Sequence, residues 1–416
     1  MDISKIYALF KKYNSVSIDT RSIKPNDIFF AIKGPNFDGN NFALYAIKNG
    51  ASYVISDNPI ISKKSDKIIY VNSSIKALQK LANYHRRKLN TKIIAITGSN
   101  GKTTSKELIL KVLKSKYNTT ATTGNLNNHL GVPLSLLQMT EKTEFGIIEM
   151  GANHLNEIAQ LCKIAEPNFG YITNFGNAHL EGFGSLEGVI KGKSELYNYL
   201  INNNSWIFHN SENKKQTSLI NNYKNTYSFG INSKSNCIIN KSDSENTLNV
   251  TYQNKIIKST IYGDYNFENI CIAIAIGKYF QVDFNDIKKG IENYLAKNNR
   301  SQITLKKNNT IILDAYNANP TSMGLALESF KKTNYKNKMI IVGDMFELGK
   351  DSNQYHQEIT NSLEKIKDSI IYIVGKYFCN TKHSDRIKSF SSTKELINNL
   401  SKTNVSDYSI LIKGSR

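Results

Sequence analysis

Residues 97–104 have the sequence Thr97-Gly98-Ser99-Asn100-Gly101-Lys102-Thr103-Thr104, and this stretch decides the fold. It follows the apolar, β-branched run 93–96 and precedes residues 105–112, whose spacing is helical. A glycine-rich loop between a strand and a helix is typical of a phosphate site, because backbone N–H groups and the positive helix N-terminus face the anion. Lys102 adds a full positive charge, and the Thr103 hydroxyl stands where it would ligate Mg²⁺.

The spacing of this loop differs from the strict Walker pattern, which has four residues between its glycines. Only Ser99 and Asn100 lie between Gly98 and Gly101. The loop alone is therefore also compatible with a Gly-Lys turn that merely caps a helix, and the rest of the chain has to decide between the two.

The chain has 416 residues, which favours two to three domains. It has no apolar run of about eighteen residues, so we expect no membrane insertion. Residues 1–5 show no basic segment followed by an apolar one, so we expect no secretory signal. The four cysteines lack paired or metal-ligand spacing and are interpreted as buried thiols in a reducing, cytoplasmic compartment: Cys162, Cys237, Cys271 and Cys379.

The formal net charge of +20 raises the question of a nucleic-acid partner. The lysines are spread along the chain rather than clustered, and no nucleic-acid-binding module is recognisable. We therefore favour solvated basic surfaces with some benefit for anionic substrates, and we expect no nucleic-acid partner.

Three α/β domains are predicted, over residues 1–88, 89–298 and 299–416. In the first, residues 27–34 and 51–56 are predicted strands, 42–49 a helix and 37–40 a turn. The result is a small N-terminal α/β domain.

The second domain contains the glycine loop and the strand-like runs 145–149 and 169–173, separated by helical segments. Alternating strands and helices indicate a parallel sheet of the P-loop ATPase type, with its site at the carboxyl ends of the strands. Glu149 and His179 fall at such ends or beyond them, and a carboxylate there would suit Mg²⁺. A solvated strand-end glutamate and a surface histidine are the alternatives.

The third domain has buried-strand runs at 311–314, 339–342, 370–374 and 409–412, with helices between them, and is predicted to be Rossmann-like. Polar and glycine residues follow three of these strands. Clusters at 314–320, 343–345 and 413–416 on one rim predict a binding edge.

Together these motifs resemble those of the ATP-dependent Mur ligases of cell-wall synthesis, in the branch that adds D-alanyl-D-alanine. The resemblance covers nearly the whole chain. It is carried by residues 19–21, 38–39, 97–104, 124–128, 149–152, 179–185, 316–320, 343–349 and 413–416. Two departures are noted: Leu313 precedes Asp314 where the family often has an acid, and we expect a further short helical stretch after Arg416.

The resemblance implies that ATP is held by Thr97, Gly98, Ser99, Asn100, Gly101, Lys102, Thr103, Thr104, Asn266, Asn269, Arg300 and Asp314. It implies that Lys102, Glu149, His179 and Lys193 are catalytic, and that Mg²⁺ is served by Thr103, Glu149, His179 and Lys193. Lys193 aligns with the lysine that this family carbamylates; a simple surface lysine is the alternative. Asp19, Thr20, Arg21, Asn127, Asn128, Tyr316, Asn317 and Asn319 would contact the substrates.

The implied reaction joins a carboxylate of UDP-N-acetylmuramoyl-tripeptide to the amine of D-alanyl-D-alanine through an acyl phosphate made from ATP. We expect a monomer. The alternatives are a related ligase that adds a single amino acid to a muramoyl peptide or glutamate to folate, and a protein that binds ATP without catalysis. The third alternative is a basic protein that binds nucleic acid.

Overall fold

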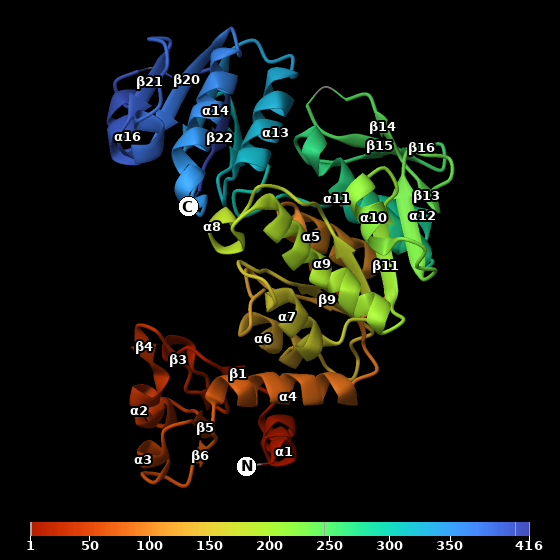
Figure 1. Cartoon of the computed structure of the whole chain (residues 1–416), viewed down its shortest axis with the longest axis vertical. Coiled ribbons are helices and arrows are strands. Elements are labelled where there is room, and N and C mark those ends of the chain that lie inside the picture. Colours follow the sequence, from red (N-terminus) through yellow and green to blue (C-terminus); the bar gives the residue numbers. More distant parts are fainter. Residues whose placement is uncertain (1, 245, 404, 416) are drawn as a thin grey trace. The chain divides into compact units, whose positions relative to one another are not determined.

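The computed structural model describes residues 2–244, 246–403 and 405–415, so Arg416 lies outside the described part (Figure 1). Its contacts divide the chain into two compact units. The first comprises Met1–Ala95, Asn118–Gly151 and Glu157–Phe169, and the second comprises Ile96–Tyr117, Ala152–Asn156 and Gly170–Arg416.

The first unit begins with a small sheet of four parallel strands in the order β1-β2-β5-β6. The strands are β1 (Val16–Ser17), β2 (Ile28–Phe30), β5 (Tyr53–Ser56) and β6 (Ile68–Tyr70). The helices are α1 (Ile3–Tyr13), α2 (Ala43–Lys48), α3 (Pro59–Ser62), α4 (Ser74–Lys88) and the 3-10 turns η1 (Thr20–Ser22) and η2 (Gly39–Phe42). Phe29, Ala46 and Val54 are buried between this sheet and its helices.

The strand predicted over 27–34 is wrong in its second half. Residues 31–32 leave the sheet after β2, and β3 (Lys33–Gly34) pairs with β4 (Phe37–Asp38), where a turn was predicted. Gly39 explains the break: its N–H donates to the Ile32 carbonyl at 2.9 Å, and an added Cβ would lie 2.7 Å from that oxygen. The backbone can close a hairpin here because residue 39 has no side chain.

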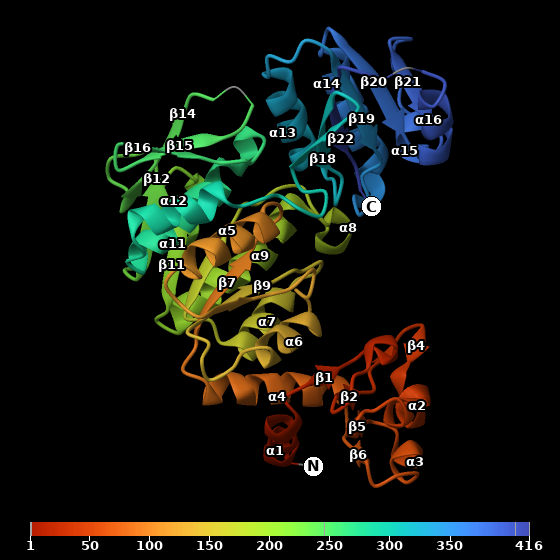
Figure 2. The same ribbon diagram turned by 180° about the vertical axis from the view of Figure 1, so that it is seen from behind.

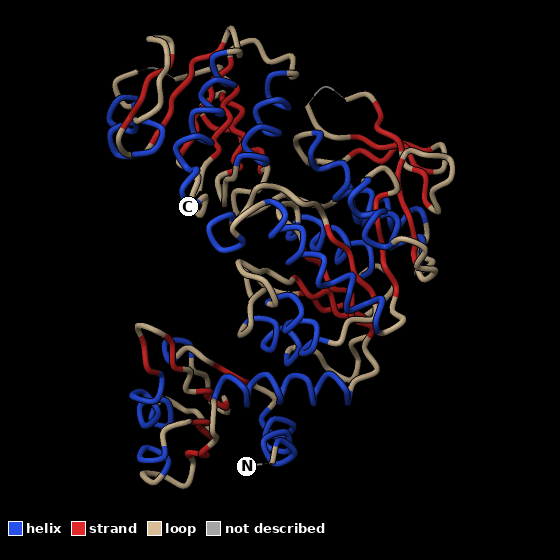
Figure 3. The backbone as a smooth tube through the Cα atoms, in the orientation of Figure 1, coloured by secondary structure: helices blue, strands red, loops and turns tan. Residues whose placement is uncertain are grey.

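The first unit also contains β9 (Phe145–Glu149), which is identical to its prediction, between β8 (Thr119–Ala121) and the first part of β7 (Lys92–Thr97). The long helix α4 packs against α6 (Gly131–Leu137) and α7 (Glu157–Ala165) (Figure 3). These helices and strands form an apolar layer in which Ile93, Ile147 and Leu136 are fully buried.

The second unit continues the same sheet from the end of β7, in the order β7-β10-β11-β12-β13, with β11 to β13 parallel. The strands are β10 (Phe169–Ile172), β11 (Trp206–Asn210), β12 (Thr226–Gly230) and β13 (Cys237–Ile238). The helices are α5 (Lys102–Leu113), α8 (Leu180–Phe183), α9 (Leu186–Asn202), α10 (Lys214–Ile220), α11 (Phe267–Tyr279), α12 (Phe284–Glu292) and the turn η3 (Asp264–Asn266). A small antiparallel sheet holds β14 (Asn240–Ser242), β15 (Asn249–Tyr252) and β16 (Lys255–Lys258).

A further sheet of the second unit has the order β17-β18-β22-β19-β20-β21, parallel except for β17 (Figure 2). The strands are β17 (Gln302–Lys306), β18 (Asn309–Asp314), β19 (Lys338–Gly343), β20 (Ser369–Val374), β21 (Ile387–Phe390) and β22 (Ser409–Lys413). The helices are η4 (Gly349–Asp351), α13 (Pro320–Lys331), α14 (Ser352–Glu364), α15 (Lys376–Cys379) and α16 (Thr393–Leu400). The predicted parallel sheet is confirmed, and β17 and β21 are additions to it.

The predicted α/β class is confirmed in all of these sheets. Among the described residues, no helix is long and apolar enough to cross a membrane.

Arg86 and Arg87, adjacent on α4, offer a test of the packing in the first unit. Arg86 is 9% exposed and donates from Nε to Ala165 O and from Nη2 to Asn168 Oδ1, both at 3.0 Å. Arg86→Ala would leave the buried Ala165 carbonyl without its charged donor and would remove the packing of a buried side chain, so we expect a loss of about 3 kcal/mol in the free energy of unfolding, measured by urea denaturation.

Arg87→Ala is the matched control. The Arg87 side chain is 67% exposed and pairs with Glu166, and an exposed ion pair contributes about 1 kcal/mol or less. Equal losses for the two variants would contradict this account of the helix packing.

Candidate functional site

The glycine loop joins β7 to α5, as predicted, and both of its glycines have positive φ. Gly98 has φ +136, and an added Cβ would lie 2.9 Å from the Thr173 nitrogen. Gly101 has φ +81 at the N-cap of α5, and an added Cβ would lie 2.5 Å from Asn269 Oδ1. Side chains at these two positions would be strained and would collide with their neighbours, so the loop conformation depends on glycine.

Hydrogen bonds tether the loop to the segment after β10. Asn100 N donates to Asn174 Oδ1 at 3.0 Å, and Asn100 O accepts from Thr173 Oγ1 at 2.6 Å. Ser99 donates from N to Asn174 O at 3.1 Å and from Oγ to Gly176 O at 2.9 Å. These bonds hold the loop backbone in one conformation before any ligand arrives.

Lys102 begins α5 and folds back over the loop. Its Nζ donates to Gly98 O at 2.5 Å and to Ser99 O at 3.2 Å, so the ammonium stands over the turn. Thr97 is buried at the end of β7, and Thr103 and Thr104 lie in the first turn of α5. This arrangement brings an ammonium, a helix N-terminus and hydroxyl groups to one point, which is the chemistry of a polyphosphate site.

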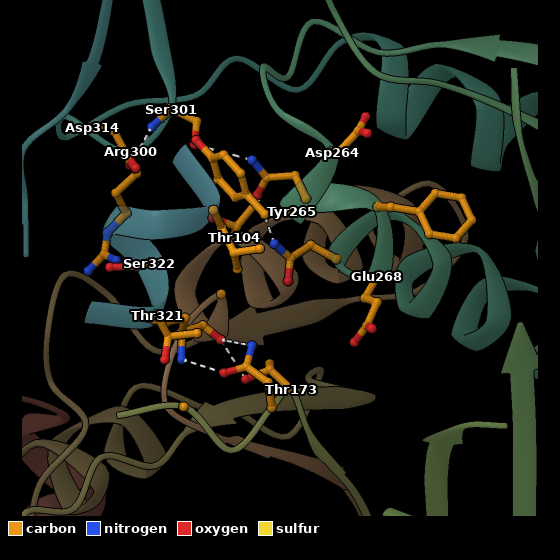
Figure 4. A pocket seen from close by; sticks show the side chains of 18 of the residues that line it. Thr104, Thr173, Asp264, Tyr265, Glu268, Arg300, Ser301, Asp314, Thr321 and Ser322 are labelled. Atoms are coloured by element: carbon orange, nitrogen blue, oxygen red, sulfur yellow. Dashed lines mark hydrogen bonds between the residues drawn. The ribbon is translucent and has the colours of Figure 1, made fainter. Parts of the chain in front are cut away.

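A cavity of about 390 Å³ opens beside the loop, lined by Asn100, Gly101, Thr104 and residues from the segment after β10, from β14 and from the sheet that contains β18. Figure 4 shows Ser301, Tyr265 and Asp314 gathered at one end of this pocket and Thr173 and Thr321 at the other. The pocket therefore extends from the loop to the rim of the sheet that contains β18.

A chain of polar side chains crosses this pocket. Asn269 Oδ1 accepts from Ser105 Oγ and its Nδ2 donates to Asn266 Oδ1, both at 2.8 Å. Asn266 Nδ2 donates to Ser301 Oγ at 3.2 Å, and Ser301 N donates to Asp314 Oδ1 at 3.0 Å. The structure thus brings together three residues predicted to contact ATP, namely Asn266, Asn269 and Asp314.

An ion pair with little exposure joins β18 and β22. Lys413, 2% exposed, donates from Nζ to Asp314 Oδ2 at 2.8 Å, and the two residues are paired across β18 and β22. A charge pair with little exposure fixes the position of the carboxylate, because either partner alone would be costly to bury.

Arg300 lines the same pocket, with its guanidinium carbon 3.7 Å from the centre of the Tyr316 ring. A cation held over an aromatic face is attracted by the ring quadrupole, whose face is partially negative, and is restricted in orientation. Tyr316, predicted to contact substrate, therefore positions a residue predicted to contact nucleotide.

The three predicted polar clusters do lie on one rim. Ser415 Oγ donates to Asn317 Oδ1 at 3.2 Å, and Ser415 N donates to Asp344 O at 3.3 Å. Asn319 caps α13 through Ser322 N at 2.9 Å and donates from Nδ2 to Asn100 Oδ1 at 2.7 Å. The last bond joins the rim directly to the glycine loop.

His179 and Lys193 belong to the second unit. His179 is left-handed (φ 55) at the start of α8, and its Nδ1 lies 2.5 Å from Glu347 Oε2 in an ion-pair contact. The imidazole holds the pKa of Glu347 below its usual range, against the effect of burial. Lys193 is not a surface lysine: it is fully buried on α9, and its Nζ donates to Ala152 O at 2.9 Å.

Glu149, Asn127 and Asn128 belong to the first unit. Glu149 ends β9, is 2% exposed and accepts from Asn127 Nδ2 at 2.9 Å. Asn128 Oδ1 accepts from Gly131 N at 2.9 Å and so caps α6. The solvated strand-end alternative for Glu149 does not hold, because this carboxylate is buried and hydrogen-bonded.

Asp19, Thr20 and Arg21 lie at the N-terminal sheet of the first unit. Arg21 Nη2 donates to Asp19 Oδ2 at 2.7 Å, and this bonding lowers the pKa of Asp19 to about 2. Thr20 begins the turn η1 that Asp19 caps. The Arg21 side chain is 89% exposed, so its guanidinium is accessible to an anion.

Sequence reasoning did not single out four residues that line the pocket, namely Thr173, Tyr265, Ser301 and Lys413. It also missed Glu347, which contacts His179 outside the pocket. Ser301 and Tyr265 stand beside Arg300 and Asn266, so extending the search by one position would have included them. Lys413 could be paired with Asp314 only once the order of the strands was known.

Comparisons with known proteins agree along the chain. Residues 12–86 match the model for the Mur ligase family catalytic domain, 96–277 that for the Mur ligase middle domain, and 299–416 that for the Mur ligase, glutamate ligase domain. The chain belongs to the Mur ligase family.

Among its relatives is UDP-N-acetylmuramoyl-tripeptide–D-alanyl-D-alanine ligase of Rickettsia prowazekii, 36% identical over 97% of this chain and 92% of that protein. Two solved structures are similar over 97% of this chain, both with a TM-score of 0.85. MurF from Acinetobacter baumannii is 30% identical with 90% of its chain covered. MurF ligase from Thermotoga maritima in complex with ADP is 27% identical with 94% covered. The predicted three-domain architecture of the family is confirmed by these likenesses.

Gly98→Ala tests the loop. The substitution places a side chain at φ +136 against Thr173, so we expect it to lower the free energy of unfolding by about 2 kcal/mol and to abolish ATP binding measured by calorimetry.

The control is Gly324→Ala on α13, where an added Cβ meets nothing within 4 Å. It should bind ATP normally and be equally stable or up to about 1 kcal/mol more stable. Normal ATP binding by the Gly98→Ala variant would contradict the assignment of this loop as the nucleotide site.

Proposed function

We propose that this chain is an ATP-dependent ligase that adds D-alanyl-D-alanine to UDP-N-acetylmuramoyl-tripeptide in peptidoglycan synthesis. The observation that carries the proposal is the glycine loop, tethered and capped by Lys102, at one end of a pocket whose polar groups belong to two sheets. The relatives named for this reaction cover nearly the whole chain, and one of the similar structures is an ADP complex.

The chemical problem is to make a carboxylate oxygen into a leaving group. The peptide carboxylate attacks the γ-phosphorus of ATP, the bond to the ADP oxygen breaks, and an acyl phosphate forms. The dipeptide amine then adds to the acyl carbon, and the tetrahedral intermediate expels phosphate as the amine loses its proton. Lys102 and the N–H groups at the N-terminus of α5 would offset the repulsion between two anions in the first step, and positioning supplies much of the rest.

The residues of the chain fit a magnesium ion that arrives with the nucleotide. Among the described residues, no group of three His, Cys, Asp or Glu side chains could hold a metal by itself. Mg²⁺ commonly keeps several waters and takes one or two protein oxygens together with substrate phosphates. Thr103 would supply such an oxygen, and the family resemblance assigns Glu149, His179 and a carbamylated Lys193 to the same ion. The ion would neutralise charge on the transferred phosphate.

Other roles follow from placement. Asn266, Asn269, Arg300 and Asp314 would hold the nucleoside and phosphates of ATP, and Tyr316, Asn317 and Asn319 the acceptor side. Asp19, Thr20, Arg21, Asn127 and Asn128, in the first unit, would contact the UDP-linked substrate. The domains would span 1–88, 89–298 and 299–416, each containing one family match.

The cysteines of the described residues are free thiols, which supports a cytoplasmic protein. The expected monomeric state stays a prediction.

The decisive experiment follows phosphate release from ATP by the purified protein. We expect release only when UDP-N-acetylmuramoyl-tripeptide and D-alanyl-D-alanine are both present, because the acyl phosphate forms on the first and is consumed by the second. Mass spectrometry should show the corresponding muramoyl pentapeptide.

Single amino acids in place of the dipeptide separate this ligase from its relatives, and equal release with them would contradict the proposal. ATP binding without product would favour the non-catalytic alternative. Lys102→Ala should lower turnover by at least about a thousandfold, and Lys114→Ala, exposed at the other end of α5, should retain it.

Lys193→Ala tests the carbamate. The Lys193 ammonium first loses a proton, and the neutral amine then adds CO₂ and releases a second proton, which replaces a cation by an anion at a fully buried position. We expect the variant to lose activity and acetate to restore part of it, since a free carboxylate can occupy the place of the missing one.

Lys191→Ala, exposed on the same helix, is the control and should need no acetate. A Lys193→Ala variant that folds but is inactive, with or without acetate, would contradict the prediction that Lys193 is carbamylated.

A further inference from the structure

A loop of the last sheet reaches α8 and contacts His179. The loop, residues 344–349, follows β19, and it meets α8 twice. Glu347 Oε2 lies 2.5 Å from His179 Nδ1, and Glu347 O accepts from Glu181 N at 3.1 Å. Figures 1 and 2 both show α8 beside the lower end of this sheet. The contact thus involves both a side chain and the backbone.

Both partners of the contact have unusual backbone conformations. His179 has φ 55 and Glu347 has φ 62, although neither is glycine. Residues other than glycine adopt this region infrequently, and they keep it where the surroundings hold them there. Two left-handed residues from different elements that meet each other indicate a contact whose geometry is specified by the fold.

The rest of the loop is firmly attached to its own sheet. Asp344 accepts from Phe378 N at 3.0 Å, and Met345 N donates to His356 Nε2 at 3.0 Å. Met345 and Leu348 are buried. The Glu347 backbone is therefore presented to α8 from a part of the loop that is anchored to its own sheet.

A carboxylate on one imidazole nitrogen has a defined effect on the other. It favours a proton on Nδ1, fixes the orientation of the ring and leaves Nε2 as the nitrogen that faces other groups. The contact therefore determines how His179 is presented, and it does so only while the rim loop is in place.

We propose that Glu347 is a positioning residue for the ligation reaction: it orients His179 through Nδ1 and so links the rim of the last sheet to the site where phosphate is transferred. The inference rests on the proposed function, because the reaction is what His179 would serve. Glu347 itself touches His179 and not the reacting atoms.

The test is a double-mutant cycle on the full chain with ATP and both substrates. Glu347→Ala should lower kcat about tenfold and leave KM for ATP within about twofold, because the group acts through His179. Glu347→Gln, which keeps an acceptor oxygen, should recover most of the loss. In a His179→Ala background, Glu347→Ala should change kcat less than twofold.

Glu181→Ala is the matched control. It removes an exposed carboxylate from the same contact region and keeps the backbone N–H that Glu347 O accepts, so kcat should stay unchanged. Thermal unfolding of each variant identifies any loss that comes from folding.

Independent, multiplicative losses for Glu347→Ala and His179→Ala would overturn the inference, and so would wild-type kcat in Glu347→Ala. A wild-type protein that makes no amide bond would instead overturn the proposed function, so the two failures are distinguishable.

Discussion

The whole second unit depends on a short backbone segment that is held in a left-handed conformation. Gly98 and Gly101 can adopt it because they lack side chains, and Thr173, Asn174 and Asn269 occupy the space that side chains would need. The hydrogen bonds from Thr173 and Asn174 are made within the protein, so the loop does not have to be ordered by its ligand. A preorganised anion site gains affinity because less conformational freedom is lost on binding.

A series of hydrogen bonds connects the helix after this loop to the last sheet, and all but one of its bonds join two side chains. Asn269, Asn266, Ser301 and Asp314 are hydrogen-bonded in series, and Lys413 closes the series with a buried ion pair. Each group satisfies the next, which is the condition under which a polar network in a protein interior adds rigidity. A nucleotide bound at the loop would therefore contact groups from two parts of the second unit, namely the helices beside the loop and the sheet that contains β18.

The features that depend on a short stretch of sequence were predicted, and those that depend on contacts between distant segments were not. β9 and the loop before α5 were predicted because an apolar β-branched run or a glycine pair identifies them within a few residues. β17 and β21 were missed because Gln302–Lys306 and Ile387–Phe390 are short and polar, as edge strands commonly are. The burial of Lys193 and the contact of Glu347 with His179 depend on how separate elements pack, and no spacing in the sequence encodes that.

The distribution of charge in the site shows why a chain with a net charge of +20 need not bind anions everywhere. Asp314 is paired with Lys413, Glu149 accepts from Asn127, and Glu347 lies against His179, so each carboxylate already has a donor. Lys102 donates to two carbonyl oxygens of its own loop, which carry no net charge. A phosphate oxygen is a stronger acceptor for an ammonium than a carbonyl oxygen, because it carries a negative charge and the carbonyl oxygen only a partial one. The Lys102 ammonium therefore gains when phosphate oxygens replace these carbonyl oxygens as its acceptors. An exposed lysine gains less from a phosphate, because water already solvates its ammonium.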